Sequence, residues 1–462
     1  MVSTAVPPHA LSSTFLLGLA PVASWFIVRP FLDPIPSLSG LYTSIGFSLF
    51  AFIATLYLVP ALGPTFIKAH LSGRDLLKDY ATPIPESLGL VCASVYTLAL
   101  ILFIPFAFSD SLTIHLTQTP EGIFVPEFPH SRLSVYLSSL LSLLMTTILG
   151  FLDDVFDIRW RHKLPIPIIA SIPLLMVYFA ERGNTHIVAL VFSQCIELTS
   201  SNKGPLYYLY MSLLSTFATN SINGSEVGQA LIIATSVILN DLFTSLGQLA
   251  SAEVEFGGVW SAGMAYGSKE LVERHLFSPY FMLPLVAVCS GFMYHNWYPA
   301  RAFPGDTLCY VTGMAFAVVG IQGHFSKTLL LFFLPQIFNF VLSCPQLFGL
   351  VPCPRHRVPR FDKVTNLLHP SKAIFMKPPS KLAATVLWIL SFFKLVDLTL
   401  HLSGVILETT NLTILNFFLV RLGPMNEKKL VQVLICCQIC GSVLAFSVRY
   451  GLAGLVYDGD RR

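Results

Sequence analysis

The fold is decided by residues 133–163, which read LSVYLSSLLSLLMTTILGFLDDVFDIRWRHK. The first twenty, 133–152, carry no charge, and a helix of about 20 apolar residues is long enough to cross a bilayer. The acidic pair Asp153-Asp154 follows at once, and a basic run, Arg159 to Lys163, comes next. The stretch therefore predicts a transmembrane helix that ends at a charged membrane edge.

Runs of the same length and low charge recur along the whole chain. Each is long enough, or nearly so, to span a bilayer as a helix. The predicted spans are 44–67, 87–109, 133–152, 164–180, 204–222, 227–247, 276–300, 307–326, 328–350 and 430–448. The apolar stretch 382–420 is interrupted by charges, so we interpret it as amphipathic or re-entrant structure.

These runs predict four regions. Residues 1–43 form an N-terminal extension with room for one extra apolar helix, an anchor or interfacial helix near 9–28. Residues 44–350 form a transmembrane core, which the polar clusters described below mark as the catalytic part of the chain. Residues 351–429 form a mixed loop region with amphipathic segments, which the charge count and the clusters below assign to the cytosol and to substrate binding. Residues 430–462 hold the last transmembrane helix and the C-terminal tail.

The composition agrees with a membrane protein. Of 462 residues, 54% are hydrophobic and 11% are charged, whereas soluble domains carry about 25% charged residues. This excludes a disordered chain, a nucleic-acid binder and an ordinary cytosolic enzyme. We expect an all-α polytopic membrane protein of about ten transmembrane helices. Most of the nine cysteines are expected to be small buried apolar residues, with a disulfide or metal site at Cys437 and Cys440 as the alternative.

The loops between the spans divide into two sets of unequal charge. One set holds 18 of the 28 Lys and Arg residues, and basic loops tend to stay in the cytosol. The excess of Lys and Arg in this set depends on the long loop 351–429, which holds 11 of the 18. That set comprises 68–86, 153–163, 223–226, 301–306 and 351–429.

Unusual polar clusters fall in all five loops of this basic set. Solvated loops would spread such groups over both faces, so the convergence predicts an active site on the cytosolic face. The clusters are Leu71-Ser-Gly-Arg-Asp-Leu-Leu-Lys78 with Pro83-Ile-Pro-Glu-Ser87, Asp153 to Lys163, Asn220-Ser-Ile-Asn-Gly-Ser-Glu226, Phe303-Pro-Gly-Asp-Thr307 and Pro352-Cys-Pro-Arg-His-Arg357.

The clusters combine two kinds of ligand. Carboxylate and amide oxygens are the ligands that magnesium prefers, and Arg and Lys hold phosphates. Together they fit a magnesium-bridged diphosphate, although an acidic pair alone would equally fit a cation site. The oxygen ligands are Asp153, Asp154, Asp306 and Asn223, and the basic groups are Lys163, Arg355 and Arg357. Structural alternatives stay open: a helix cap at Asp153-Asp154, a basic anchor after it, and a turn at Asp306.

Taken in order, the motifs resemble the eukaryotic dolichyl-phosphate N-acetylglucosamine-1-phosphate transferases, the targets of tunicamycin. These belong to the glycosyltransferase 4-like polyprenyl-phosphate hexose-1-phosphate transferases. The resemblance covers about 44 to 360, plus Leu422-Gly-Pro424. Its motifs are Gly73-Arg-Asp-Leu76, Ile84-Pro-Glu-Ser87, Leu149-Gly-Phe-Leu-Asp-Asp-Val155, Arg159-Trp-Arg-His-Lys163, Tyr294-His-Asn-Trp-Tyr-Pro299, Gly305-Asp-Thr307, Phe316 to Lys327, Cys344-Pro-Gln and Pro352 to Arg357.

The resemblance implies a multi-pass endoplasmic reticulum enzyme with its active site facing the cytosol. It implies that UDP-GlcNAc and dolichyl phosphate react with Mg2+ as cofactor. GlcNAc-diphosphodolichol and UMP would be formed, in the first step of lipid-linked oligosaccharide synthesis for N-glycosylation. Membrane lipid is the expected environment and nucleic acid is no partner. The sequence does not decide the oligomeric state, and a homodimer stays open.

The resemblance also assigns roles to residues. Asp153, Asp154 and Lys163 would be catalytic, with Lys163 holding the dolichyl phosphate, and Asp306 would bind magnesium with Asn223. The lipid-phosphate groove would be lined by Thr216, Phe217, Ala218, Thr219, Asn220, Ser221, Ile222 and Asn223. Arg74, Asp75, Leu76 and Glu86 would contact the nucleotide, and Arg355, His356 and Arg357 the diphosphate and sugar. We favour direct in-line attack by the acceptor phosphate, with Asp154 orienting or deprotonating it; a covalent aspartyl intermediate is the alternative.

One departure from the family pattern affects the predicted site. Asn223 runs directly into Gly224-Ser-Glu-Val-Gly-Gln229, where the family has about six more residues and a second Asn, or about 9 Å of helix. Three explanations compete: a splicing or gene-prediction error, an altered but working site, and a catalytically impaired member.

Two other functions compete with this reading. A magnesium-dependent intramembrane prenyltransferase would need a second aspartate-rich motif, and only Asp153 to Asp157 qualifies. A transporter would show internal repeats and polar groups at mid-membrane. The halves of the chain show no repeat, and the polar groups gather at one face.

Overall fold

The computed structural model describes most of the chain, in two compact units. The described residues are 13–32, 39–75, 83–108, 117–119, 122–124, 129–156, 158, 160–163, 165–180, 188–191, 194–197, 204–222, 227–250, 269–323, 325–354, 357–402 and 404–452. The larger unit spans 7–72, 85–331 and 444–462, and the smaller spans 73–84 and 332–443 with the first six residues. Two-residue strands β1 (Ser72–Gly73) and β2 (Ile84–Pro85) lie where the chain passes between them.

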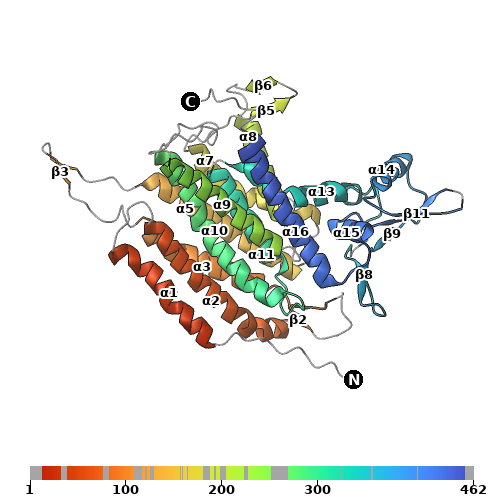
Figure 1. The fold of residues 1–462 in the computed structure, drawn as a ribbon, viewed down its shortest axis with the longest axis horizontal. Helices are drawn as coiled ribbons and strands as arrows, with labels where there is room; N and C mark the ends of the chain where they lie inside the picture. Colours follow the sequence, from red (N-terminus) through yellow and green to blue (C-terminus); the bar gives the residue numbers. More distant parts are fainter. Residues whose placement is uncertain are drawn as a thin grey trace. The chain divides into compact units, whose positions relative to one another are not determined.

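The larger unit is a bundle of helices arranged around α11 (Gly305–Gln322), which lies against α3, α5, α8 and α10 (Figure 1). Every residue of α11 from Thr307 onward is buried. The surrounding helices are α1 (Ser13–Leu32), α2 (Ser39–Lys68), α3 (Gly89–Ala107), α5 (His130–Phe156), α6 (Trp160–Lys163), α7 (Ile166–Ala180), α8 (Gly204–Ser221), α9 (Val227–Ala250), α10 (Lys269–Asn296) and α12 (Ser326–Phe332). Two hairpins, β3 (Thr117–Thr119) with β4 (Gly122–Phe124) and β5 (Val188–Val191) with β6 (Gln194–Glu197), and a π-helix, Ser447–Leu452, complete it.

The smaller unit combines helices with a small antiparallel sheet of strand order β10-β11-β9. An apolar core joins α13, α14 and this sheet through Leu342, Leu387 and Ile406. A second core joins α15 to the first turns of α16. Its elements are α13 (Leu334–Leu347), β7 (Arg360–Asp362), β8 (Leu367–His369), β9 (Lys372–Ile374), α14 (Lys381–Phe392), β10 (Leu398–Leu400), β11 (Ile406–Thr410), α15 (Ile414–Leu422) and α16 (Glu427–Phe446).

The interrupted stretch 382–420 thus forms two short helices and two strands. Its charges explain why it does not form one span. Lys394 and Asp397 lie in the turn between α14 and β10, and Glu408 on β11 pairs with Lys372 of β9 at 2.9 Å.

The chain is a mostly helical, polytopic membrane protein, but the described residues do not reach the predicted ten spans. Six helices are long and apolar enough to cross a membrane, or seven if the bent pair α12 and α13 counts as one span. The six are Thr14–Leu32, Ser39–Lys68, Gly89–Ala107, His130–Phe156, Phe277–Asn296 and Glu427–Gly451.

Nine of the ten predicted runs nevertheless fall on a single helix each, and the run 328–350 falls on α12 and α13, which are bent by 74°. Helix α7 has only 15 residues, α8 carries several hydroxyl and amide side chains, and α11 begins and ends with polar residues. Helix α11 is enclosed by other helices, so it does not need an apolar surface for lipid. The count also includes α1, which the sequence suggested only as an anchor or interfacial helix.

The prediction that most cysteines are buried is wrong for the eight whose surroundings the structure describes. Only Cys92, Cys289 and Cys309 are buried, whereas the other five are partly or fully exposed. None of the eight forms a disulfide, Cys437 and Cys440 of α16 included. No group of three His, Cys, Asp or Glu residues suited to a metal occurs within the part of the chain that the structure describes.

Candidate active site

The site begins where the C-terminal end of α5 meets the first turn of α11. Asp154 of α5 accepts hydrogen bonds from the backbone N–H groups of Asp306, at 2.5 Å, and Thr307, at 3.2 Å. It also accepts one from the Thr307 hydroxyl at 2.5 Å. The residue before α11 is Pro304, which supplies no side-chain cap. Asp154 therefore caps α11 from another helix, because the first N–H groups of a helix need an acceptor and favour a negative charge.

Two glycines allow this close approach. Gly305 has a φ of +66°, and a Cβ on it would lie 2.5 Å from the Asp154 carboxylate. Gly150, one turn before Asp154 on α5, faces the α11 backbone, and a Cβ there would lie 2.7 Å from the Thr307 Cα. Any larger residue at either position would push the acidic pair away from α11.

Asp153 points to a different set of partners and is almost fully buried. One carboxylate oxygen accepts the Ile158 N–H at 3.0 Å, which fixes the turn after α5. The other oxygen lies 2.7 Å from the Lys163 ammonium and accepts a hydrogen bond from the Tyr310 hydroxyl at 3.0 Å. Tyr310 was not among the predicted site residues. Its only sequence signal is its position four residues after Asp306 on the same helix, which puts both on one face.

Lys163 joins the two acidic positions. Its Nζ lies 2.7 Å from Asp153 and 2.9 Å from Asp306. Burial would lower the pKa of Lys163, but the hydrogen bonds to these two carboxylates and their charges outweigh it, so the pKa lies above its usual value. The ammonium therefore keeps its positive charge at neutral pH.

The carboxylate of Glu86 interacts electrostatically with Asp306. Backbone hydrogen bonds pair its segment with the loop before α11: Phe303 N–H donates to Pro85 at 2.9 Å, and Gly89 N–H donates to Pro304 at 2.8 Å. Partial burial and then the negative charge of Asp306 raise the pKa of Glu86. Two carboxylates, those of Asp153 and Asp306, thus contact the Lys163 ammonium, and a third, that of Glu86, lies close enough to Asp306 to feel its charge. The excess of negative charge suits a divalent cation.

The comparisons with known proteins agree with this site. The profile described as Glycosyl transferase family 4 matches residues 136–324, which include α5, α6 and α11. The UDP-N-acetylglucosamine–dolichyl-phosphate N-acetylglucosaminephosphotransferase of Schizosaccharomyces pombe is 42% identical over 91% of this chain and 94% of its own length. The proteins of the same name from Saccharomyces cerevisiae (39%, over 91% and 94%) and Dictyostelium discoideum (36%, over 87% and 88%) are also similar.

The chain belongs to the UDP-N-acetylglucosamine–dolichyl-phosphate N-acetylglucosaminephosphotransferase family. Four of the residues that sequence reasoning assigned to the reaction centre of this transferase, Asp153, Asp154, Lys163 and Asp306, lie together in the structure. Glu86 joins them through its interaction with Asp306.

The predicted lipid-phosphate groove of the transferase lies on α8, which packs against α11. A Cβ on Gly313 of α11 would lie 2.4 Å from the Thr219 Cα. The polar side chains of this segment bond to their own helix: the Thr219 hydroxyl donates to Ser215 at 2.8 Å, and the Asn220 amide to Thr216 at 2.9 Å. Thr219 is buried, whereas Thr216 and Asn220 are only partly covered. Phe217 and Ser221 are partly covered as well, and Ala218 and Ile222 are buried.

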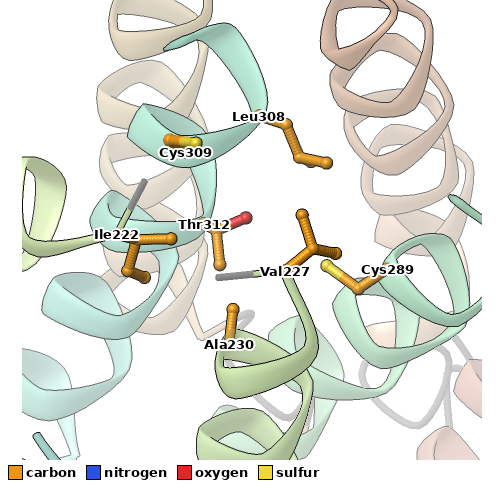
Figure 2. A pocket seen from close by; sticks show the side chains of 7 residues that line it. All are labelled: Ile222, Val227, Ala230, Cys289, Leu308, Cys309 and Thr312. Atoms are coloured by element: carbon orange, nitrogen blue, oxygen red, sulfur yellow. The ribbon is translucent and has the colours of Figure 1, made fainter. Parts of the chain in front are cut away.

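A narrow apolar pocket lies where α8 ends and α9 begins. Figure 2 shows the Thr312 side chain among Ile222, Val227 and Ala230, with Leu308 and the two cysteines around it. It is lined by Ile222, Val227, Ala230, Cys289, Leu308, Cys309 and Thr312. None of these seven residues is charged, so the pocket lining offers no group that would hold a phosphate.

Other predicted residues of the transferase fall in the smaller unit or outside the described residues. Arg74, Asp75 and Arg357 belong to the smaller unit. The Arg357 carbonyl accepts a hydrogen bond from the Asn416 side chain at 3.0 Å, and its guanidinium Nη1 is buried without a hydrogen-bond partner. An unpaired buried donor of this kind suits an anionic ligand. Leu76, Asn223, Arg355 and His356 lie outside the described residues.

Proposed function

We propose that the chain transfers GlcNAc-1-phosphate from UDP-GlcNAc to dolichyl phosphate and releases UMP. A dolichyl phosphate oxygen attacks the phosphorus bonded to GlcNAc. The bond from that phosphorus to the UMP oxygen breaks, so the products are GlcNAc-diphosphodolichol and UMP. The observation that carries the proposal is the Lys163 ammonium held between Asp153 and Asp306, in a chain that matches relatives of this activity over nearly their full length.

Lys163 binds the acceptor phosphate in this mechanism. A phosphate monoester has a second pKa of about 6, so the acceptor is mostly ionised at neutral pH and needs no strong base. The charge of Lys163 attracts and orients it, which is where most of the rate enhancement of such a reaction arises.

The two aspartates of the acidic pair, Asp153 and Asp154, have different roles in this mechanism. Both oxygens of Asp154 are occupied by the first turn of α11, so Asp154 positions Asp306 and does not take a proton from the acceptor. Asp153 is buried and paired with Lys163. Direct attack by the acceptor fits this arrangement better than a covalent intermediate on either aspartate.

The carboxylate of Asp306 would hold Mg2+ together with Asn223. Asp306 offers hard oxygen ligands, its side chain is 44% exposed, and the excess negative charge around it fits a divalent cation. When bound, the ion would neutralise charge on the diphosphate and the leaving UMP.

We assign the chain to the endoplasmic reticulum membrane, with the site facing the cytosol. In this assignment, ten spans between 44 and 448 form the core. Helices α7, α8 and α9 cross as short or partly polar spans that expose apolar side chains such as Met176 and Leu209. Helix α11 crosses as a span enclosed by other helices, and α1 lies outside the ten.

The test is UMP release by the purified chain with UDP-GlcNAc, dolichyl phosphate and magnesium. We expect turnover that tunicamycin inhibits and that Lys163→Met abolishes. The same assay on a chain with the Asn223 loop lengthened by six residues tests the impaired-member alternative. Activity only in the lengthened chain would place a defect in that loop. Absence of turnover in both folded chains would overturn the proposal, and release of pyrophosphate from a prenyl diphosphate would support the prenyltransferase instead.

A further inference from the structure

Helix α14 carries large apolar side chains on the side that the protein covers and also on the side that it leaves open. Ala383 and Leu387 are buried, and Leu387 packs with Leu342 and Ile406 in the core of the smaller unit. Side chains on the opposite side are open: Phe392 is 81% exposed and Trp388 49%. Leu382 and Ile389 are also exposed, and Phe393 directly after the helix continues the stripe.

These exposed residues form one continuous face. At 100° per residue, Leu382, Trp388, Ile389 and Phe392 all fall within about a third of the helix circumference, opposite Leu387. Two polar residues share this third: Thr385, whose hydroxyl donates to the Lys381 carbonyl of its own helix at 2.9 Å, and Lys381 at the N-terminal end. Single exposed apolar residues are normal on protein surfaces, but a contiguous patch of large ones marks an interaction surface.

The position of α14 within its unit indicates what covers this face. Leu387 packs against Leu342, which lies five residues, or about 8 Å, before the end of α13. Helix α15 packs against Leu430, in the first turn of the candidate span α16. The unit is therefore tied to the first turn of a candidate span, α16, and to the last turns of α13, which counts as part of a span only together with α12.

The length of α14 and its flanking charges fit the lipid–water interface. Its 12 residues extend about 18 Å, too short to cross a hydrocarbon core of about 30 Å. Exposed lysines, Lys381 and Lys394, stand at its two ends, and the segment 363–396 contains five lysines and no acidic residue. Tryptophan is enriched at this depth, and lysines next to it attract anionic headgroups.

We propose that α14 and Phe393 form a membrane-docking surface that inserts into the bilayer interface, with Lys381 and Lys394 toward anionic phospholipid headgroups. The helix lies in the plane of the membrane with its exposed face among the acyl chains. The proposal does not depend on the transferase reaction, because it rests only on the packing, exposure and charge of the smaller unit.

The test uses tryptophan fluorescence of the full chain in vesicles of phosphatidylcholine and phosphatidylserine. The Trp388 signal is obtained by subtracting the emission spectrum of the Trp388→Phe variant from that of the wild type. We expect brominated phosphatidylcholine to quench most of it and aqueous iodide to leave it unchanged. Trp25→Phe is the matched positive control, since Trp25 is 54% exposed on the candidate span α1.

Two outcomes would overturn the proposal. Quenching of Trp388 by iodide alone would place the face in water. Quenching by neither reagent would place it against another protein.

A second set of variants tests the headgroup contact. Lys381→Gln combined with Lys394→Gln should weaken the bromolipid quenching in vesicles that contain phosphatidylserine, and should have no effect in phosphatidylcholine alone. Lys372→Gln is the control, because Lys372 already pairs with Glu408 at 2.9 Å. If Lys372→Gln weakened the bromolipid quenching as much as the double variant, Lys381 and Lys394 would not be part of the docking surface.

Discussion

Gly150 lies where α5 comes closest to the backbone of α11, and replacing it tests how the site is assembled. A Cβ at this position would be 2.7 Å from the Thr307 Cα, whereas ordinary van der Waals contact begins at 3.4 Å. Gly150→Ala must therefore separate the two backbones by about 0.7 Å. The atom in the way belongs to the main chain, so no side chain can move aside to relieve the contact.

The expected loss follows from that displacement. Thr307 is next to Asp306, and a 1 Å misplacement of a reacting group costs up to about 100-fold in rate. We expect Gly150→Ala to lower kcat about 10- to 100-fold. Overpacking of this kind costs about 1–3 kcal/mol of stability, which leaves the protein folded.

The measurement is UMP release at saturating substrates, together with the thermal unfolding temperature in detergent. Gly18→Ala is the matched control, because a Cβ on Gly18 of α1 would meet nothing within 4 Å. A folded Gly150→Ala protein with kcat within twofold of the wild type would refute the reasoning. It would mean that α5 and α11 can separate without disturbing the reaction.

Three further predictions concern the carboxylates. Asp154→Asn puts an amide N–H among the donors of α11, so we expect a lower unfolding temperature and weaker Mn2+ binding by electron paramagnetic resonance; unchanged Mn2+ binding would contradict the positioning role. Tyr310→Phe removes one hydrogen bond to Asp153, worth about 1 kcal/mol, so kcat should fall about fivefold with KM unchanged, and a KM change alone would argue against it. Glu86 has a raised pKa, so its ionisation costs stability above its unfolded pKa of about 4.3. Glu86→Gln should therefore raise the unfolding temperature at pH 7 but not near pH 4, and an equal rise at both would refute the ionisation argument.

The positions of the helices could be predicted well from the sequence, because each apolar run had to bury its backbone polar groups as a helix. Their number as membrane spans could not be predicted in the same way. Hydropathy reports contact with lipid, and α11 is surrounded by protein. The polar residues at its N-terminal end, Asp306 and Thr307, belong to the candidate site.

The charged residues of the candidate site could be predicted from the sequence. Which partner each of them contacts could not. Asp153 and Asp154 are adjacent in the chain, yet they point to different partners because neighbouring side chains on a helix diverge by about 100°. Which one caps α11 depends on the rotation of α5 about its axis, and this in turn depends on the contact at Gly150. Tyr310 was missed for the same reason, since its hydroxyl reaches Asp153 only in this packing.

The hydrogen bond between Asp154 and the first turn of α11 also determines when, during synthesis, the reaction centre can form. The two partners are 152 residues apart in the chain, and ribosomes add about 5–20 residues per second. Helix α5 is therefore complete roughly 8–30 s before the first turn of α11 exists. During that interval every new molecule holds an acidic pair at a membrane edge without the donors that will later bind it. The reaction centre therefore cannot form until about two-thirds of the chain has been made, and a defect at Thr307 arises only after α5 has already been synthesised.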